Sequence, residues 1–254
     1  MSKTTTQLHR QLEPLSASSH AGLRWGAPTS FGFATGVTRL PMCAGEALQV
    51  ATALPFVFER QTDGRFQLVV LCAVFSDRNA LIGTDGRWMA GYQPAVLRGY
   101  PFGWLQDDAG RLAAALDVAS PNVSRGHGEP LWQEPGRLSH HTAEMIAFLG
   151  TVVQDFETTR VLTSQIVDHG LLRNDLLIDG GEQGSRRHTD LRVVKADALS
   201  ALPDAALRDL HNTGALALLY LHQASQAHMG RLFQIEQARQ NDEAPPALDF
   251  SLFG

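Results

Sequence analysis

Residues 79–104 read N-A-L-I-G-T-D-G-R-W-M-A-G-Y-Q-P-A-V-L-R-G-Y-P-F-G-W, an unusually aromatic stretch of the chain. Five aromatic residues, two prolines and two arginines surround a D-G turn signal, although the whole chain has only 12 Phe, 4 Trp and 3 Tyr. If residues 100–104 are extended, their three aromatic side chains share one face, and Pro101 then indicates an edge strand or a bulge. The stretch therefore predicts either a specialised surface or a special layer of the core.

The segments around this stretch favour an antiparallel, β-rich N-terminal half. Pro41 is expected to begin a short helix over residues 44–54, with apolar Leu48, Ala51 and Leu54 at helical spacing. A T-D-G signal at residues 62–64 predicts a hairpin turn. Strands are predicted, from runs of β-favouring residues, over residues 31–40, 56–59, 66–75 and 112–118.

The pattern changes near residue 138, and helices are expected beyond it. Ser139 is a candidate N-cap for a helix that runs to about His169, with Gly170 as its C-terminal stop. Further elements are predicted beyond it: a hairpin of 172–178 and 191–194 around the glycines of 180–184, a helix from Asp204, and one long final helix over 214–240. Strands followed by helices predict an α+β fold. We expect an N-terminal arm (1–30), one domain (31–240; β-rich over 31–137, mainly helical over 138–240) and a C-terminal tail (241–254).

Composition excludes several classes of function. The net charge is −5, and the 21 basic residues form no run, so a nucleic-acid surface is not expected. The longest apolar run, 215–221, is too short to span a bilayer, and the first residues lack the apolar segment of a secretory signal. We therefore expect a cytoplasmic protein. Cys43 and Cys72 are expected to be buried thiols.

Several blocks of the sequence resemble the bacterial SapC-like family, and together they cover most of the chain. The central block resembles the family pattern in the positions Asn79, Asp85, Gly86, Trp88, Tyr92, Pro94, Arg98, Tyr100, Pro101 and Phe102. An earlier block is similar through Pro41, Glu46, Ala51, Pro55 and Phe58, a following one through the glycines at 128 and 136, and a late one through His222 and Ser225. Gly99 stands where the family often has a second arginine.

The resemblance implies association with surface-layer gene clusters, and with neighbouring genes for outer-membrane receptors and flavin-dependent halogenases. It implies no catalytic residue set and no particular cofactor. We expect an accessory or binding protein that recognises a partner protein, a peptide or a small surface-related ligand. The alternatives are an enzyme that modifies a peptide or small molecule, metal-assisted or beside a flavin-dependent partner, and a subunit of a surface layer. The oligomeric state stays open.

Candidate site residues fall into three groups. An aromatic box with a guanidinium, able to hold a ligand by stacking and cation–π contacts, is predicted from Trp88, Tyr92, Arg98, Tyr100 and Trp104. The alternative for these residues is a core layer. His140, His141 and Glu144 begin the predicted helix and form a weaker metal-site candidate, which needs a third ligand such as His127 or His169. His222 and Ser225, one turn apart, suit a structural hydrogen bond better than a nucleophile pair.

Overall fold

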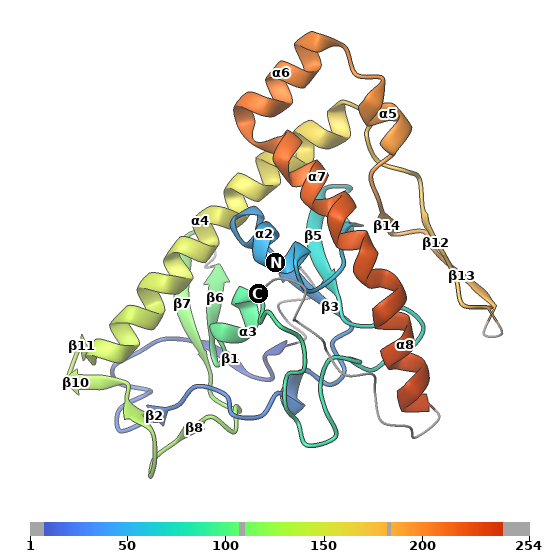
Figure 1. The fold of residues 1–254 in the computed structure, drawn as a ribbon. Helices are drawn as coiled ribbons and strands as arrows, with labels where there is room; N and C mark the ends of the chain where they lie inside the picture. Colours follow the sequence, from blue (N-terminus) through green and yellow to red (C-terminus); the bar gives the residue numbers. More distant parts are fainter. Residues whose placement is uncertain (1–7, 107–109, 182–183, 241–254) are drawn as a thin grey trace.

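The computed structural model describes residues 8–106, 110–181 and 184–240, and two long helical arms flank the central strands (Figure 1). In Figure 1, α4 (His140–Asp168) forms one arm of an inverted V, and α7 (Ala215–Ser225) with α8 (Met229–Gln240) forms the other. Antiparallel strands fill most of the N-terminal half and helices most of the C-terminal half, which confirms the α+β class. In the part of the chain that the structure describes, no helix is both long and apolar enough to cross a bilayer.

The central sheet has four antiparallel strands in the order β14-β4-β5-β3. These strands are β14 (Leu191–Arg192), β4 (Phe56–Arg60), β5 (Phe66–Leu71) and β3 (Arg39–Met42). β4 and β5 form the predicted hairpin, with Val57 opposite Val69. Gly64 lies in its turn with φ of 83°, a conformation that glycine adopts at little cost. β5 ends at Leu71, before the predicted end at residue 75.

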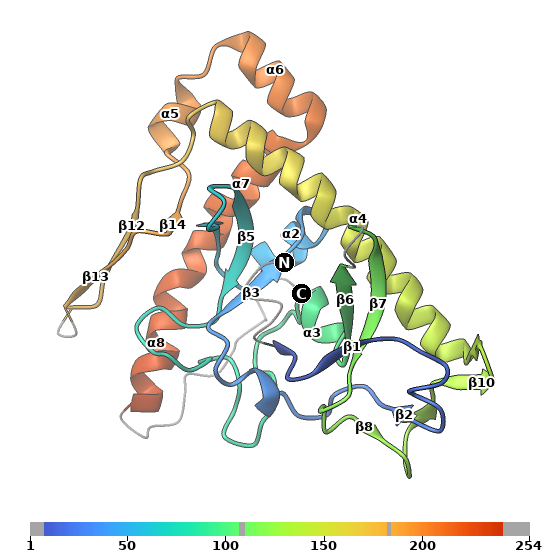
Figure 2. The same cartoon turned by 180° about the vertical axis from the view of Figure 1, so that it is seen from behind.

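A second antiparallel sheet, β1-β7-β6, lies beside α4 (Figure 2). It consists of β1 (Leu12–Pro14), β7 (Leu112–Asp117) and β6 (Phe102–Gln106). A third sheet joins β8 (Val123–Ser124), β2 (Arg24–Trp25) and β9 (Glu129–Pro130), and a small hairpin joins β10 (Trp132–Glu134) to β11 (Arg137–Leu138). The described part of the expected arm therefore contributes β1 and β2 to these sheets. Residues 241–254, expected as a tail, lie outside the described residues.

The prediction of one strand over 31–40 is wrong. Residues 32–34 form a short 3-10 helix, and β3 begins only at Arg39. The hydroxyl of Thr35 donates to the Gly32 carbonyl at 2.9 Å, which closes the turn, and the ring of Phe33 stacks on Tyr100 with centroids 3.7 Å apart. Pro41 begins no helix but lies within β3, an edge strand, where its missing N–H is tolerated.

The expected helix over 44–54 is present in a shorter form. A 3-10 turn (Ala44–Glu46) leads into α2 (Ala47–Ala51). Leu54 is buried as expected, but Leu48 is 59 % exposed, so the predicted apolar face is wrong at that position. The reason is that α2 is too short for its periodicity to define a buried face.

The aromatic residues Tyr100, Phe102 and Trp104 do not lie on one strand. β6 begins at Phe102, after α3 (Ala95–Arg98) and a cis Tyr100–Pro101 bond. Phe102 and Trp104 both pack in a hydrophobic cluster against α4, whereas the buried Tyr100 ring stacks on Phe33. The predicted shared face is therefore wrong for Tyr100.

The predicted boundaries of α4 are confirmed. The side chain of Ser139 accepts from the backbone N–H of Thr142 at 3.3 Å, so Ser139 is the N-cap. The helix ends at Asp168, and Gly170 follows with φ of 66°.

The single long helix predicted over 214–240 is wrong, because α7 and α8 are separated by a 3-10 turn at Gln226–His228. The hydroxyl of Ser225 donates back to the His222 carbonyl at 2.7 Å, and the Gln226 side chain donates to the Phe56 carbonyl at 2.9 Å. These side-chain bonds compete with the regular helical pattern.

The second hairpin pairs β12 (Leu176–Asp179) with β13 (Ser185–His188). Its second strand was predicted at 191–194, but Leu191 and Arg192 instead form β14 and pair with β4. An unpredicted helix, α5 (Ala196–Ser200), comes before α6 (Asp204–Thr213), which begins at the predicted residue.

The core has two parts. The larger cluster surrounds the central sheet and takes in α2 and α7, and it includes the fully buried Phe56, Phe58 and Leu68. The smaller cluster lies between β6, β7 and α4, where the Trp25 and Phe102 rings meet edge to face with centroids 4.8 Å apart. Residues 76–104 leave the central sheet and lead to β6, so they border both clusters.

Candidate functional site

Two hollows lie along the 76–104 segment, and the first contains part of the predicted aromatic box. We call it the Tyr92–Arg98 groove: a hollow of about 310 Å³ whose lining includes Cys43, Glu46, Tyr92, Arg98, Phe148, Val152 and Asp155. Tyr92 and Arg98 come from the segment itself, Cys43 and Glu46 from the residues before α2, and the other three from α4. The groove therefore forms where three separate parts of the chain meet.

Glu46 organises the groove from beneath. It is only 4 % exposed, and one carboxylate oxygen accepts from the Tyr92 hydroxyl at 2.9 Å and from the Ala95 backbone N–H at 2.8 Å. The other oxygen accepts from the Cys43 backbone N–H at 3.1 Å. Burial, together with the nearby Glu46 charge, raises the pKa of Tyr92 and that of Cys43 far above their usual range. Both groups therefore keep their protons at neutral pH.

Arg98 ends α3 and lies at the surface of the groove. Its guanidinium carbon is 4.9 Å from the centre of the Phe148 ring and 5.8 Å from that of the Tyr92 ring. Its Nη2 donates to the Tyr92 hydroxyl at 3.2 Å. Among the described residues, no carboxylate pairs with this guanidinium. The two rings thus fix an exposed cation in one position.

The other three residues of the predicted box lie apart from this pair. The indole of Trp88 donates to the Tyr92 carbonyl at 2.8 Å and packs against the larger core cluster, so it supports Tyr92 from behind. Tyr100 is fully buried and donates to Asp117 at 3.3 Å. Trp104 packs in the smaller cluster and donates to the Leu149 carbonyl at 3.3 Å. The structure therefore brings together Tyr92 and Arg98, with Trp88 behind them, but not all five side chains.

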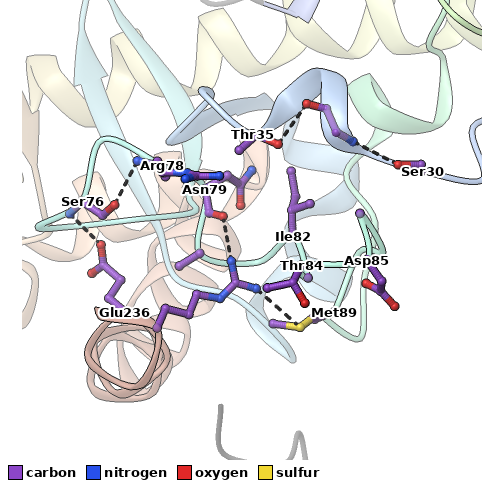
Figure 3. A pocket seen from close by; sticks show the side chains of 15 residues that line it. Ser30, Thr35, Ser76, Arg78, Asn79, Ile82, Thr84, Asp85, Met89 and Glu236 are labelled. Atoms are coloured by element: carbon purple, nitrogen blue, oxygen red, sulfur yellow. Dashed lines mark hydrogen bonds between the residues drawn. The ribbon is translucent and has the colours of Figure 1, made fainter. Parts of the chain in front are cut away.

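The second hollow lies at the other end of the segment, and we call it the Arg78–Arg239 cavity (Figure 3). It encloses about 800 Å³ between residues 76–89, the turn at residues 30–35 and the last turns of α8. In Figure 3, Ser76, Arg78 and Glu236 come from one side, and Thr84, Asp85 and Met89 from the other. Its size is within the range of small-molecule sites, about 300–1,000 Å³.

The D-G signal at residues 85–86 shapes the wall of this cavity. Gly86 has φ of 81°, and the Gly83 N–H donates to the Arg87 carbonyl at 2.7 Å, so the predicted turn is confirmed. A Cβ atom added at Gly86 would lie 2.3 Å from the hydroxyl oxygen of Ser30. Only glycine lets this turn approach Ser30 so closely.

Glu236 fastens the opposite wall. It is 2 % exposed, and its carboxylate accepts from the backbone N–H groups of Val74, Phe75 and Ser76, at 3.0, 3.1 and 2.8 Å. Burial raises its pKa, against the opposing effect of these hydrogen bonds. Neither Glu236 nor Arg239 was predicted as a site residue, because both lie on a helix whose pattern indicates only packing.

The weaker metal candidates form separate pairs. His140 contacts Glu144 at 3.3 Å, whereas His141 contacts Glu129 at 3.5 Å, and all four side chains are more than half exposed. His169 contacts Asp209 instead, at 3.6 Å. In the described ranges, no group of three or more His, Cys, Asp and Glu is placed to hold a metal ion.

His222 and Ser225 lie in the core. The Ser225 hydroxyl donates to the His222 carbonyl rather than to its ring. The ring packs edge to face on Phe56 with centroids 5.5 Å apart, and burial lowers the pKa of His222 to about 3. These contacts are packing and backbone hydrogen bonds of the core, and the imidazole is neutral at physiological pH.

Comparison with known proteins gives one match. The model of the SapC family matches residues 15–232, and this range includes every residue that lines the Tyr92–Arg98 groove. No curated protein and no solved structure matches the chain. A match over most of the chain means that the chain belongs to the SapC family.

Proposed function

We propose that this member of the SapC family is a binding protein, and that the Tyr92–Arg98 groove recognises an acidic segment of a partner protein or peptide. The observation that carries the proposal is the exposed Arg98 guanidinium, which Tyr92 and Phe148 hold in place while no described carboxylate pairs with it. A planar, preorganised guanidinium suits a carboxylate, because it can donate two parallel hydrogen bonds.

The shape of the groove supports a protein or peptide ligand. A volume of about 310 Å³ is at the lower end of the range of ligand sites and is enough for one or two side chains of a peptide. Phe148 and Val152 contribute apolar surface to the lining, and both acidic residues of the groove, Glu46 and Asp155, already accept from backbone N–H groups of the chain. Arg98 is therefore the group left to meet an incoming carboxylate.

The protonation of the groove favours binding over covalent catalysis. A cysteine acts as a nucleophile in its thiolate form, and burial keeps the Cys43 thiol protonated. The Tyr92 hydroxyl is likewise protonated and already donates to Glu46. The metal-assisted enzyme considered above gains no support from His140, His141 and Glu144. His140 contacts Glu144, whereas His141 contacts Glu129, so the three side chains do not converge.

The test uses peptides selected on the protein itself. A phage library of random heptapeptides is depleted on the Arg98→Ala variant and then selected on the unaltered chain. We expect the selected peptides to be rich in Asp and Glu. Synthetic copies should bind Arg98→Ala at least tenfold more weakly, a loss of about 1.4 kcal/mol or more.

Two further variants serve as controls. Arg208→Ala removes an exposed arginine of α6 and the same unit of charge, and it should bind like the unaltered chain. Arg98→Lys keeps the charge but loses the planar fork and should bind at an intermediate level. Selected peptides without acidic residues, or equal binding to Arg98→Ala when its circular dichroism is unchanged, would contradict the proposal.

A further inference from the structure

The Arg78–Arg239 cavity has a charge pattern that the groove proposal does not use. Arg239 lies in the last turn of α8, and among the described residues its guanidinium donates to the Asn79 carbonyl at 3.4 Å and to the Met89 sulfur at 3.6 Å. Arg78 is exposed, and in the described part of the chain its only hydrogen bond is from its backbone N–H to the Ser76 hydroxyl, at 3.0 Å. Within the described ranges, neither guanidinium pairs with a carboxylate.

The two acidic residues of the cavity already have partners of their own. The Glu236 carboxylate accepts hydrogen bonds from three backbone N–H groups. Asp85 accepts from the Arg87 backbone N–H at 3.0 Å and faces the Arg87 guanidinium at 4.0 Å. Neither of these carboxylates pairs with Arg78 or Arg239, so both guanidinium groups remain available in the hollow (Figure 3).

Two positive groups in one partly buried hollow stabilise an anion between them. Burial lowers the pKa of Arg239, and the nearby charge of Arg78 lowers it further. Such mutual repulsion is relieved when a negative group enters. The rest of the lining is mixed: hydroxyl groups of Ser30, Thr35, Ser76 and Thr84 lie beside apolar surface from Ala80, Ile82 and Met89.

We propose that this cavity is a second binding site, which takes a small organic carboxylate that carries an apolar group. Arg78 and Arg239 would receive the carboxylate, and Ile82 and Met89 would contact the apolar group. The volume of about 800 Å³ accommodates a molecule of this kind and is more than an inorganic anion needs. The proposal is independent of the Tyr92–Arg98 groove, because the two hollows share no lining residue.

Isothermal titration calorimetry on the full chain tests the site with a matched pair of probes. N-acetyl-leucine carries a carboxylate and an apolar side chain, and N-acetyl-leucinamide has the same shape without the charge. We expect saturable binding of the acid, at least tenfold weaker binding of the amide, and weaker binding of inorganic phosphate than of the acid. No saturable binding of the acid, equal binding of the amide, or phosphate binding as tight as the acid would overturn the proposal.

Variants locate the binding. Arg78→Ala should weaken N-acetyl-leucine binding at least tenfold, and its exposed position leaves the core intact. Arg208→Ala and Arg98→Ala should leave it unchanged, so failure here and failure of the groove proposal are distinguishable. Equal binding to Arg78→Ala would overturn the site.

The tail provides the last control, because Asp242 and Glu243 follow α8 in the sequence after Asn241 alone. The double variant Asp242→Asn/Glu243→Gln should bind the acid as the unaltered chain does. Binding that arises only in this double variant would overturn the proposal, since the tail carboxylates would then be the natural partners of the arginines.

Discussion

Replacing His222 by leucine should remove a large part of the acid sensitivity of this protein. The imidazole is 1 % exposed, and burial lowers its pKa to about 3 from an ordinary value of 6.5. In the unfolded chain the same group binds a proton below about pH 6.5, whereas in the folded chain it stays neutral down to about pH 3. The unfolded state therefore binds more protons in this window, and the stability of the fold decreases as the pH decreases through it.

The size of the effect follows from this difference in proton binding. The linkage relation gives a loss of about 2 kcal/mol between pH 8 and pH 5, and of roughly 4–5 kcal/mol by pH 3. The value at pH 5 is the better test, because it changes little if the folded pKa is one unit higher. Leucine has nearly the volume of histidine, and Gln226 keeps its bond to the Phe56 carbonyl, so the fold should tolerate the change.

Urea unfolding at pH 8, 7, 6 and 5, followed by circular dichroism, measures the effect. We expect the free energy of unfolding of His222→Leu to fall by about 2 kcal/mol less than that of the unaltered chain between pH 8 and pH 5. His211→Leu changes an exposed histidine of α6 and should follow the profile of the unaltered chain. Parallel profiles for the unaltered chain and His222→Leu would refute the reasoning.

Three substitutions test the walls of the Arg78–Arg239 cavity and the packing of the core by the same urea assay. Glu236→Ala leaves three backbone N–H groups without their acceptor and should cost about 3–5 kcal/mol, whereas the exposed Glu157→Ala should cost less than about 1 kcal/mol; equal costs would contradict the role of Glu236. Tyr100→Ala removes a fully buried ring and should cost about 3–5 kcal/mol, while Tyr100→Phe should cost about 1 kcal/mol, and a mild effect of alanine would show that the site collapses. Gly86→Ala should cost about 1–3 kcal/mol, because φ is 81° and the new Cβ meets Ser30; adding Ser30→Ala should restore part of the loss, and no restoration would assign the whole cost to the backbone.

The elements that the sequence predicted well are those with local signals. Ser139 begins α4 and Gly170 follows its end, and both act within a few residues of the sequence. A turn signal likewise defines the β4–β5 hairpin. The prediction of a strand over residues 31–40 failed because the Phe33 ring packs on Tyr100, which lies far along the chain. The prediction of one long final helix failed for the same reason, because the break after Ser225 involves the hydrogen bond from Gln226 to the distant Phe56 carbonyl.

The candidate site divides in the same way. Tyr92 and Arg98 are six residues apart, and α3 brings them together, so the sequence alone could place them in one site. Glu46 and Phe148 complete the groove from distant segments; Glu46 was marked only as one position of a block that resembles the family, and no pattern marked Phe148. The Arg78–Arg239 cavity is harder still to predict from the sequence, because two of its walls are about 160 residues apart in the chain.

The long reach of Glu236 also affects the order in which the chain can fold during its synthesis. Its carboxylate fixes the backbone at Val74 and Ser76, which leave the ribosome about 160 residues before it. The strands of the central hairpin can pair early, since their contacts are local. The segment that follows them gains its anchor only when α8 has been made, so the two walls of the Arg78–Arg239 cavity come together only after α8 has left the ribosome. A chaperone would therefore meet residues 74–76 without this anchor while the following ~160 residues are made.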